Sequence, residues 1–150
     1  MASLLTLPLE LLIAVSVYLP TPDLSALRLT CKQVEKSLYE WFAKEFFTKK
    51  QFMLTEKSLQ AFIDISKHVS FSKKLTHVII GTDVYGDSIA AFKDEEAAAC
   101  WVQGYRDQKA LISTAVDYEM LVEAFRSLPN LQTVGLRDCK TSGSCTHAQY

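Results

Sequence analysis

The 150 residues of this chain suffice for one ordinary domain, or for a small module followed by part of a second one. Hydrophobic residues make up 49% of the chain and charged residues 22%, so it can bury a core and is too apolar for general disorder. Sixteen Lys and Arg residues against seventeen Asp and Glu leave a net charge of -1, which disfavours nucleic-acid binding driven by a basic field.

The four cysteines, Cys31, Cys100, Cys139 and Cys145, are irregularly spaced and form no CxxC motif. An even number of cysteines could form two disulfides, but a chain of this size can fold without them. We therefore expect reduced thiols in an intracellular protein of the cytoplasm or the nucleus.

The stretch LTLPLELLIAVSVYLPTPDLSALRLTCK, residues 5–32, is almost free of charge. One interpretation is the N-terminal signal segment of a secreted or membrane-associated small helical protein. A signal segment begins with basic residues, however, and MAS has none. The charge-free run at residues 11–21 is about half of the ~20 residues that span a membrane. Burial against another protein explains the stretch better.

Helix signals in this stretch support burial against a partner. Pro8 fits the first helical position, and Glu10 lies in the first turn, where the helix dipole favours a carboxylate. Over residues 9–19 the apolar side chains point nearly all around the helix axis. One part of this helix would pack on its own domain, and the rest must meet something else.

Two more helices are predicted after the break at YLPTPDL. Thr21 is the expected N-cap of the second helix, with Pro22 at its first position. Thr30 and Gln33 form a capping-box pattern that begins a third helix. The apolar stripe of the third helix consists of Val34, Leu38, Trp41, Phe42 and Phe46. Three short helices with surplus apolar surface on the first two indicate a helical docking module.

The segment LPLELLIAVSVYLPTPDLSALRLTCKQVEKSLYEWF resembles the F-box, an N-terminal motif of three helices. The pattern of the motif is Leu-Pro-x-Glu-aliphatic, a hydrophobic pair before a break, then Asp-Leu, then Leu-Arg followed by Cys-Lys. The matching positions are Leu7, Pro8, Glu10, Leu11, Ile13, Tyr18, Leu19, Asp23, Leu24, Leu27, Arg28, Cys31 and Lys32. So many matches in the right order make the resemblance specific.

The resemblance implies docking on the Skp-family adaptor of an SCF-type cullin–RING E3 ubiquitin ligase, with this chain as its exchangeable substrate receptor. It implies protein–protein interaction with an unknown protein substrate, and neither catalysis nor a cofactor. The implied adaptor contacts are Leu7, Pro8, Leu9, Glu10, Ile13, Leu19, Leu24 and Leu27. The alternative, a three-helix subdomain without a partner, does not explain apolar residues on every face of the first helix.

The rest of the chain alternates between helix and strand signals. FMLT is a short strand candidate, Thr55 caps a helix predicted in TEKSLQAFIDISKHV, and KLTHVIIG predicts a strand. The expected core residues of this unit are Leu59, Phe62, Ile63, Val69, Leu75, Val78 and Ile80. A related helix in DYEMLVEAFRSL precedes a strand in PNLQTVGL. Its expected core residues are Tyr118, Leu121, Val122, Phe125, Leu128, Leu131, Val134 and Leu136.

The two units share the pattern (K/N)L-x-x-V-x-(I/L) at an offset of 56 residues. A helix feeding a strand is the element of leucine-rich-repeat-like solenoids. This half of the chain resembles the repeat region that follows the F-box in many fungal F-box proteins. The long spacing departs from regular repeats, and the resemblance implies a truncated region whose last strand has an exposed edge.

The predicted architecture is mostly α with some β (α+β). Residues 1–47 form the F-box helical module, and residues 48–137 form an incomplete helix–strand repeat region. Good helix formers predict a helical insertion at about 94–115, which lengthens the first unit. Residues 138–150 lose all periodicity and are expected to be a disordered tail.

Cys139, Cys145 and His147 lie close together and suggest a zinc site. Their spacing, Cys-x5-Cys-x-His, fits no usual ligand pattern, and a fourth ligand would have to come from far away. We therefore predict no metal site here.

Cys100 with His68 or His77 suggests a thiol–imidazole pair of the kind that cysteine nucleophiles use. No local signature supports the pair, and a small buried cysteine on an Ala-rich helix is the simpler interpretation. We predict no catalytic residue anywhere in the chain.

Overall fold

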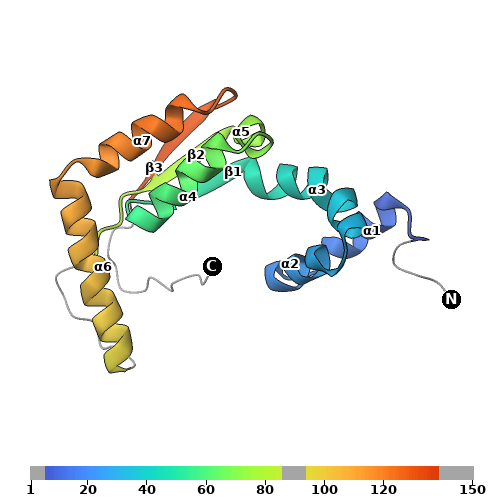
Figure 1. Ribbon diagram of the computed structural model, residues 1–150, viewed down its shortest axis with the longest axis horizontal. Coiled ribbons are helices and arrows are strands. Elements are labelled where there is room, and N and C mark those ends of the chain that lie inside the picture. Colours follow the sequence, from blue (N-terminus) through green and yellow to red (C-terminus); the bar gives the residue numbers. More distant parts are fainter. Residues whose placement is uncertain (1–5, 86–93, 139–150) are drawn as a thin grey trace. The chain divides into compact units, whose positions relative to one another are not determined.

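The chain forms two compact units, Met1–Thr48 and Lys49–Tyr150, and Figure 1 shows their helices and strands in a computed structural model. The structure describes residues 6–85 and 94–138. Helices predominate in both units, and a small sheet belongs to the second, which confirms the predicted α+β class.

The N-terminal unit consists of α1 (Leu9–Ser16), α2 (Thr21–Thr30) and α3 (Lys32–Phe47). Both α1 and α2 pack against α3. The buried side chains that hold the three helices together are Leu12, Ser16, Leu24, Val34, Leu38 and Ala43. The core is small, and it uses only part of the apolar surface that the sequence provides.

The predicted caps of the second and third helices are each wrong by one residue. Helix α2 begins at Thr21 and its N-cap is Pro20, while the N-cap of α3 is Cys31. Cys31 has extended backbone, so its Sγ accepts a hydrogen bond from the Val34 N–H at 3.5 Å. Thr30 is still part of α2, and its hydroxyl donates to the carbonyl of Leu27 at 2.7 Å. The sharp junction between the two helices leaves room for one capping residue only.

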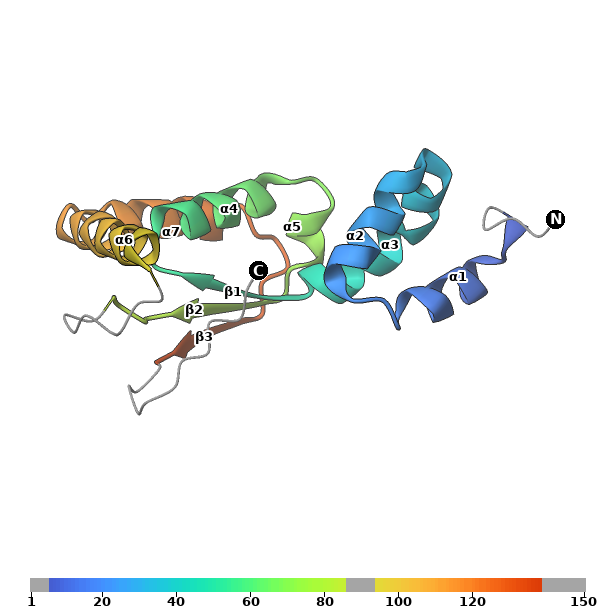
Figure 2. The ribbon, with the colours of Figure 1, turned by 90° about the horizontal axis from the view of Figure 1, so that it is seen from below.

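The C-terminal unit is a parallel three-stranded sheet in the order β1-β2-β3. In chain order its elements are β1 (Lys49–Met53), α4 (Glu56–Lys67), α5 (Phe71–Lys74), β2 (His77–Gly81), α6 (Glu95–Ser113), α7 (Val116–Arg126) and β3 (Thr133–Arg137). Figure 2 shows the helices on one face of the strands. Neighbouring parallel strands need helical crossover connections, because the chain must return to the same end of the sheet before the next strand begins.

The strand register pairs the residues that the sequence repeat matches. Val78 lies opposite Val134, and Ile80 lies opposite Leu136. Residues 56 apart in the sequence therefore lie side by side in neighbouring strands. Asn130 connects the two helix–strand repeats of the C-terminal unit by donating to the Lys73 carbonyl at 2.8 Å.

The core of this unit lies between the sheet and the helices. Phe62 is fully buried at its centre, stacked on Phe52 with ring centroids 4.3 Å apart and edge-on to Phe125 at 5.3 Å. The buried cluster comprises Phe52, Phe62, Ile63, Leu75, Val78, Ile80, Ala124 and Leu128. Most of the residues that periodicity assigned to the core are in this cluster or packed on it.

Four predicted core residues are exposed instead. Val69 is 74% exposed because α4 ends at Lys67 and the chain turns away from the core. Tyr118 is 68% exposed on the outer flank of α7. Val134 and Leu136 are 52% and 77% exposed, since no helix of the described ranges covers β3.

Gln108 joins the long helix α6 to the sheet. Its side chain is buried, and its amide donates to the carbonyls of Leu54 and Asp83, each at 3.0 Å. Its oxygen accepts from the Tyr85 N–H at 2.8 Å. One side chain thus satisfies three backbone groups in the loops that follow β1 and β2. The predicted insertion is observed as this helix, which extends past Gly104.

Candidate docking surface

Helix α1 turns a narrow stripe of its surface toward the core. Leu12 and Ser16, four residues apart, are its only buried side chains. The Ser16 hydroxyl donates to the Leu12 carbonyl at 2.8 Å, so the polar group inside the unit is satisfied. Ile13 is half-buried beside the cluster of Leu12, Val34 and Leu38. The remaining sides of α1 face away from the core.

The outward sides of α1 and its flanks are also apolar. Large exposed hydrophobic side chains there are Leu7, Leu9, Leu11, Val15, Val17 and Tyr18, and this set is called the docking surface below. Tyr18 is 88% exposed, so packing within the unit does not account for it. Exposed large apolar side chains gathered on one short helix make it a candidate surface for contact with a partner.

The structure divides the predicted adaptor contacts into three groups. Leu7, Pro8, Leu9 and Glu10 are exposed at the start of α1, where a partner could reach them. Ile13, Leu19 and Leu27 are half-buried. Leu24 is 2% exposed and belongs to the core, so its predicted place on the contact surface is corrected. It fills the interior because α2 packs this side of its helix onto α3.

Several exposed apolar residues were missed by the sequence-based list of contacts. Leu11, Val15 and Val17 belong to the docking surface, and Leu29 on α2 is 86% exposed. These residues could have been identified from the side of α1 that is buried. Once Leu12 and Ser16 are assigned to the core, Leu11 and Val15, each one residue earlier and about 100° around the helix axis, must face away from it.

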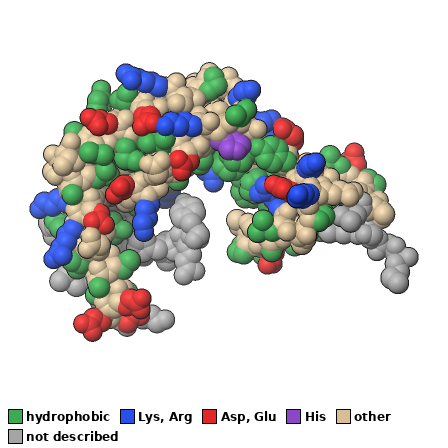
Figure 3. All heavy atoms as spheres, viewed as in Figure 1, with side chains coloured by type: hydrophobic (Ala, Val, Ile, Leu, Met, Phe, Trp, Pro, Cys, Tyr) green, Lys and Arg blue, Asp and Glu red, His purple; other side chains and the backbone are tan. Residues whose placement is uncertain are grey.

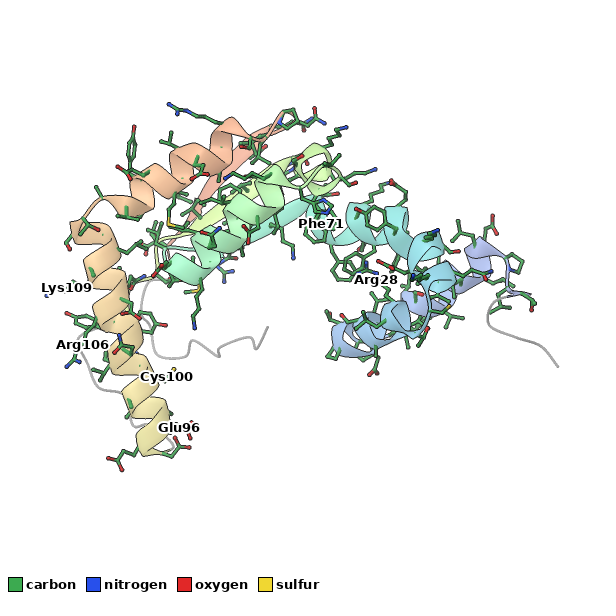
Figure 4. The ribbon with its side chains drawn as sticks, viewed as in Figure 1. Arg28, Phe71, Glu96, Cys100, Arg106 and Lys109 are labelled. Atoms are coloured by element: carbon green, nitrogen blue, oxygen red, sulfur yellow. The ribbon has the colours of Figure 1, made fainter. Side chains whose placement is uncertain are left out.

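Arg28 holds α2 against α3 within the same unit. Its guanidinium lies over the ring of Phe42, 3.6 Å from the centroid, as a cation–π contact. Its Nε is buried without a hydrogen-bond partner in the part of the chain that the structure describes. Figure 4 shows Arg28 on the N-terminal helices. The stacking position suits arginine better than lysine, because a planar guanidinium covers an aromatic face.

The thiol–imidazole pair considered from the sequence is not formed. Cys100 is exposed on α6, contrary to the expectation that it is buried, and Figure 4 shows it far from Phe71. His68 stacks on Phe71 at 4.0 Å and accepts from two backbone N–H groups. The ring of His77 is hydrogen-bonded to Thr76 at 2.8 Å. Each imidazole therefore has neighbours other than the thiol.

Metal and membrane sites were searched for within residues 6–85 and 94–138. No group of three or more potential ligand side chains in these ranges could hold a metal ion. Cys139, Cys145 and His147 lie outside the described residues. No helix in the same ranges combines the length and the apolar character needed to cross a bilayer.

The C-terminal unit carries a groove on the outer side of α7. Its volume is about 410 Å³, and its lining residues are Tyr118, Glu119, Val122, Glu123, Arg126 and Ser127. Figure 3 shows acidic and basic side chains close together over the helices of this unit, and acidic residues gathered at the start of α6. The lining of the groove combines apolar side chains with side chains of opposite charge.

Comparison with known families locates the recognisable part of the chain. The family model of the F-box domain matches residues 4–36. The match spans α1, α2 and the beginning of α3, and thus includes the docking surface. No curated protein and no solved structure matches the chain significantly.

Proposed function

Because this chain is an F-box protein by its N-terminal unit, we propose that it docks on a Skp-family adaptor and brings a protein substrate to an SCF-type cullin–RING ubiquitin ligase. F-box domains bind the Skp adaptor of these ligases. The observation that carries the proposal is the docking surface on α1, which lies within the matched residues. The chain acts by protein–protein interaction and performs no catalysis.

The energetics of α1 support adaptor binding. Full burial of a leucine side chain stabilises a complex by ~1.5–3 kcal/mol. Leu9 and Leu11 are each about half exposed in the free unit, so a partner can still cover roughly half of each side chain. Glu10 sits beside them in the first turn and adds a charged rim to an apolar centre. This anatomy is common in protein interfaces.

The test is an association measurement between the purified chain and the adaptor by calorimetry. Replacing Leu7 and Pro8 together with Ala is expected to weaken binding by at least about tenfold, or about 1.4 kcal/mol. The circular dichroism spectrum should stay unchanged, because both residues are exposed outside the core. Val69→Ala, at an exposed apolar residue of the other unit, is the matched control.

Unchanged affinity in the Leu7 and Pro8 double variant would contradict docking through α1. Leu24→Ala provides a second comparison, since Leu24 is in the core and its loss should lower the stability of the N-terminal unit. If Leu24→Ala weakened binding while the unit kept its full stability, the division between core and contact residues would be wrong.

The C-terminal unit is the proposed substrate-binding part. Its parallel strands follow one another in chain order with helices on one face, which supports a leucine-rich-repeat-like region of the kind found after the F-box in many fungal F-box proteins. An intracellular location, in the cytoplasm or the nucleus, follows from the adaptor's role. A pull-down from native cell extract with identification of the captured proteins tests adaptor and substrate binding together.

A further inference from the structure

Within residues 6–85 and 94–138, strand β3 is the last strand of the sheet, and its outer edge has no partner strand. Its Thr133 N–H bonds to the Thr76 carbonyl, and its Arg137 carbonyl accepts from the Thr82 N–H. The odd-numbered residues of β3 therefore direct their backbone groups to β2. Because backbone groups alternate along a strand, those of Val134 and Leu136 point to the free edge. In Figure 2, β3 lies at the outside of the sheet.

The side chains at this edge are apolar on the helix-facing side. Val134 and Leu136 pair with the buried Val78 and Ile80, so they share that face, yet both are more than half exposed. The opposite face carries Gly135, where an added Cβ would lie 3.7 Å from Ile79 Cγ1. The strand has no proline and no charge on its helix-facing side. Exposed edge strands normally carry a proline or a charged residue, which prevents pairing with another chain.

The strand is self-complementary about Gly135. In an antiparallel pair of two β3 strands centred on this glycine, each Val134 lies opposite a Leu136 of the other copy. Both residues direct their backbone groups outward, so the two pairs form four hydrogen bonds. The apolar side chains then make one continuous row on the helix-facing side, and Arg137 faces Thr133 rather than another cation.

We propose that the outer edge of β3 binds β3 of a second copy of this chain. The two three-stranded sheets then form one six-stranded sheet whose two central strands are antiparallel. The two-fold axis passes midway between the two Gly135 residues at right angles to the sheet, so the helices of both copies stay on one face. A second copy is preferred to an extended segment of another protein because the strand's own sequence supplies both halves of the pair.

Helix α7 is consistent with this arrangement. Glu123 forms an ion pair with Lys67 of α4, which places α4 on that flank of α7. Tyr118 and Val122 line the same surface groove as Glu123. The two-fold axis makes the two copies of α7 antiparallel. The acidic first turn of one α7, with Glu119, then lies at the same end as the basic last turn of the other, with Arg126.

The mass of the full chain in solution, measured by sedimentation over a range of concentrations, tests the proposal. The wild-type chain is expected to dimerise. Val134→Pro removes two of the four intermolecular hydrogen bonds and no bond to β2, so the association constant should fall by about tenfold or more. Val69→Lys, at an exposed apolar residue elsewhere in the unit, should leave it unchanged.

Cross-linking tests the register. In the proposed pair the Gly135 Cα atoms are about 4.5 Å apart, within disulfide reach. Gly135→Cys, in a chain whose four native cysteines are replaced by Ser, is expected to give a covalent dimer with oxidised glutathione. Thr133→Cys in the same background should not, because Thr133 faces Arg137 of the other copy.

Three results would overturn the proposal. One is a monomeric chain at all concentrations. Another is a dimer that Val134→Pro leaves intact, which would move the contact to another surface, such as α1. The third is a monomer whose β3 edge binds an extended segment of a different protein, detected as complex formation that Val134→Pro abolishes.

Discussion

Helices α1 and α4 show how the two units use their apolar residues differently. Helix α4 buries Leu59, Phe62, Ile63 and Ser66 on one side, and polar residues occupy the other. Helix α1 buries two side chains and leaves leucines and valines exposed. The hydrophobic residues of α4 match the needs of its own core, whereas those of α1 exceed them. The surplus supports the proposal that α1 binds a partner as well as packing on its own unit through Leu12 and Ser16.

This difference predicts where substitutions affect stability and where they affect binding only. Changes within the core of the C-terminal unit should have the largest effects on its free energy of unfolding. Changes on the docking surface should affect association and leave unfolding almost unchanged.

Phe62→Ala is expected to destabilise the C-terminal unit by about 3–5 kcal/mol, because it removes a fully buried ring from between two other rings. Urea unfolding followed by far-UV circular dichroism measures the change. Leu11→Ala on the exposed side of α1 is the comparison, with an expected effect within about 0.5 kcal/mol.

Equal effects of Phe62→Ala and Leu11→Ala would contradict the distinction between the two helices. Phe62→Leu sharpens the test. It retains an apolar side chain and should cost less than Ala, because the cavity left between Phe52 and Phe125 is smaller.

Gln108→Leu is expected to destabilise the same unit by about 2–4 kcal/mol, because three backbone groups lose their partner. The measurement is again urea unfolding. Gln103→Leu is the matched control on the same helix. Gln103 is exposed and its amide donates to Asp107 in the next turn, at 2.7 Å, so its loss should cost at most about 0.5 kcal/mol.

If Gln108→Leu were neutral, burial of the leucine would have offset the loss of three hydrogen bonds. The position of α6 would then depend on apolar packing alone. Protection of the Tyr85 amide from hydrogen exchange separates the two cases, since this N–H donates to Gln108 and should lose its protection in the variant.

Periodicity predicted the helices and strands well because it reports which side of an element is buried. The spacing of Phe62, Ile63 and Leu59 fits a helix packed on one side, and the alternation of Val78 and Ile80 fits a strand with one buried face. The repeat offset of 56 residues matches the register observed between β2 and β3. The periodicities are local signals, because each depends on residues within a single element.

Interactions across long stretches of sequence could not be predicted in this way. Gln108 forms hydrogen bonds with three backbone groups in two distant loops, and nothing in its own helix distinguishes it from Gln103. The phase of α1 was also undetermined, because a helix that is apolar on all sides can bury any of them. Packing on α3 determines which side of α1 is buried. Leu24 was assigned to the contact surface because the side of α2 that packs on α3 was likewise undetermined by the sequence.

Arg28→Ala is expected to destabilise the N-terminal unit by about 1 kcal/mol through loss of the cation–π contact with Phe42. Arg28→Lys should recover only part of this, because an ammonium group lacks the planar surface that stacks on the ring. Thermal unfolding of the N-terminal unit measures both variants. A lysine variant as stable as the wild type would show that charge matters here and stacking does not.

Lys67→Met is expected to change the stability of the C-terminal unit by at most about 0.5 kcal/mol. Lys67 and Glu123 connect α4 to α7, but their side chains are 55% and 50% exposed, so water screens the pair. A double-mutant cycle with Glu123→Gln isolates the coupling energy. A coupling above about 1 kcal/mol would mean that ion pairing, and not only the aromatic core around Phe62, holds the two helices together. The contrast with the N-terminal unit would then concern charge as well as apolar burial.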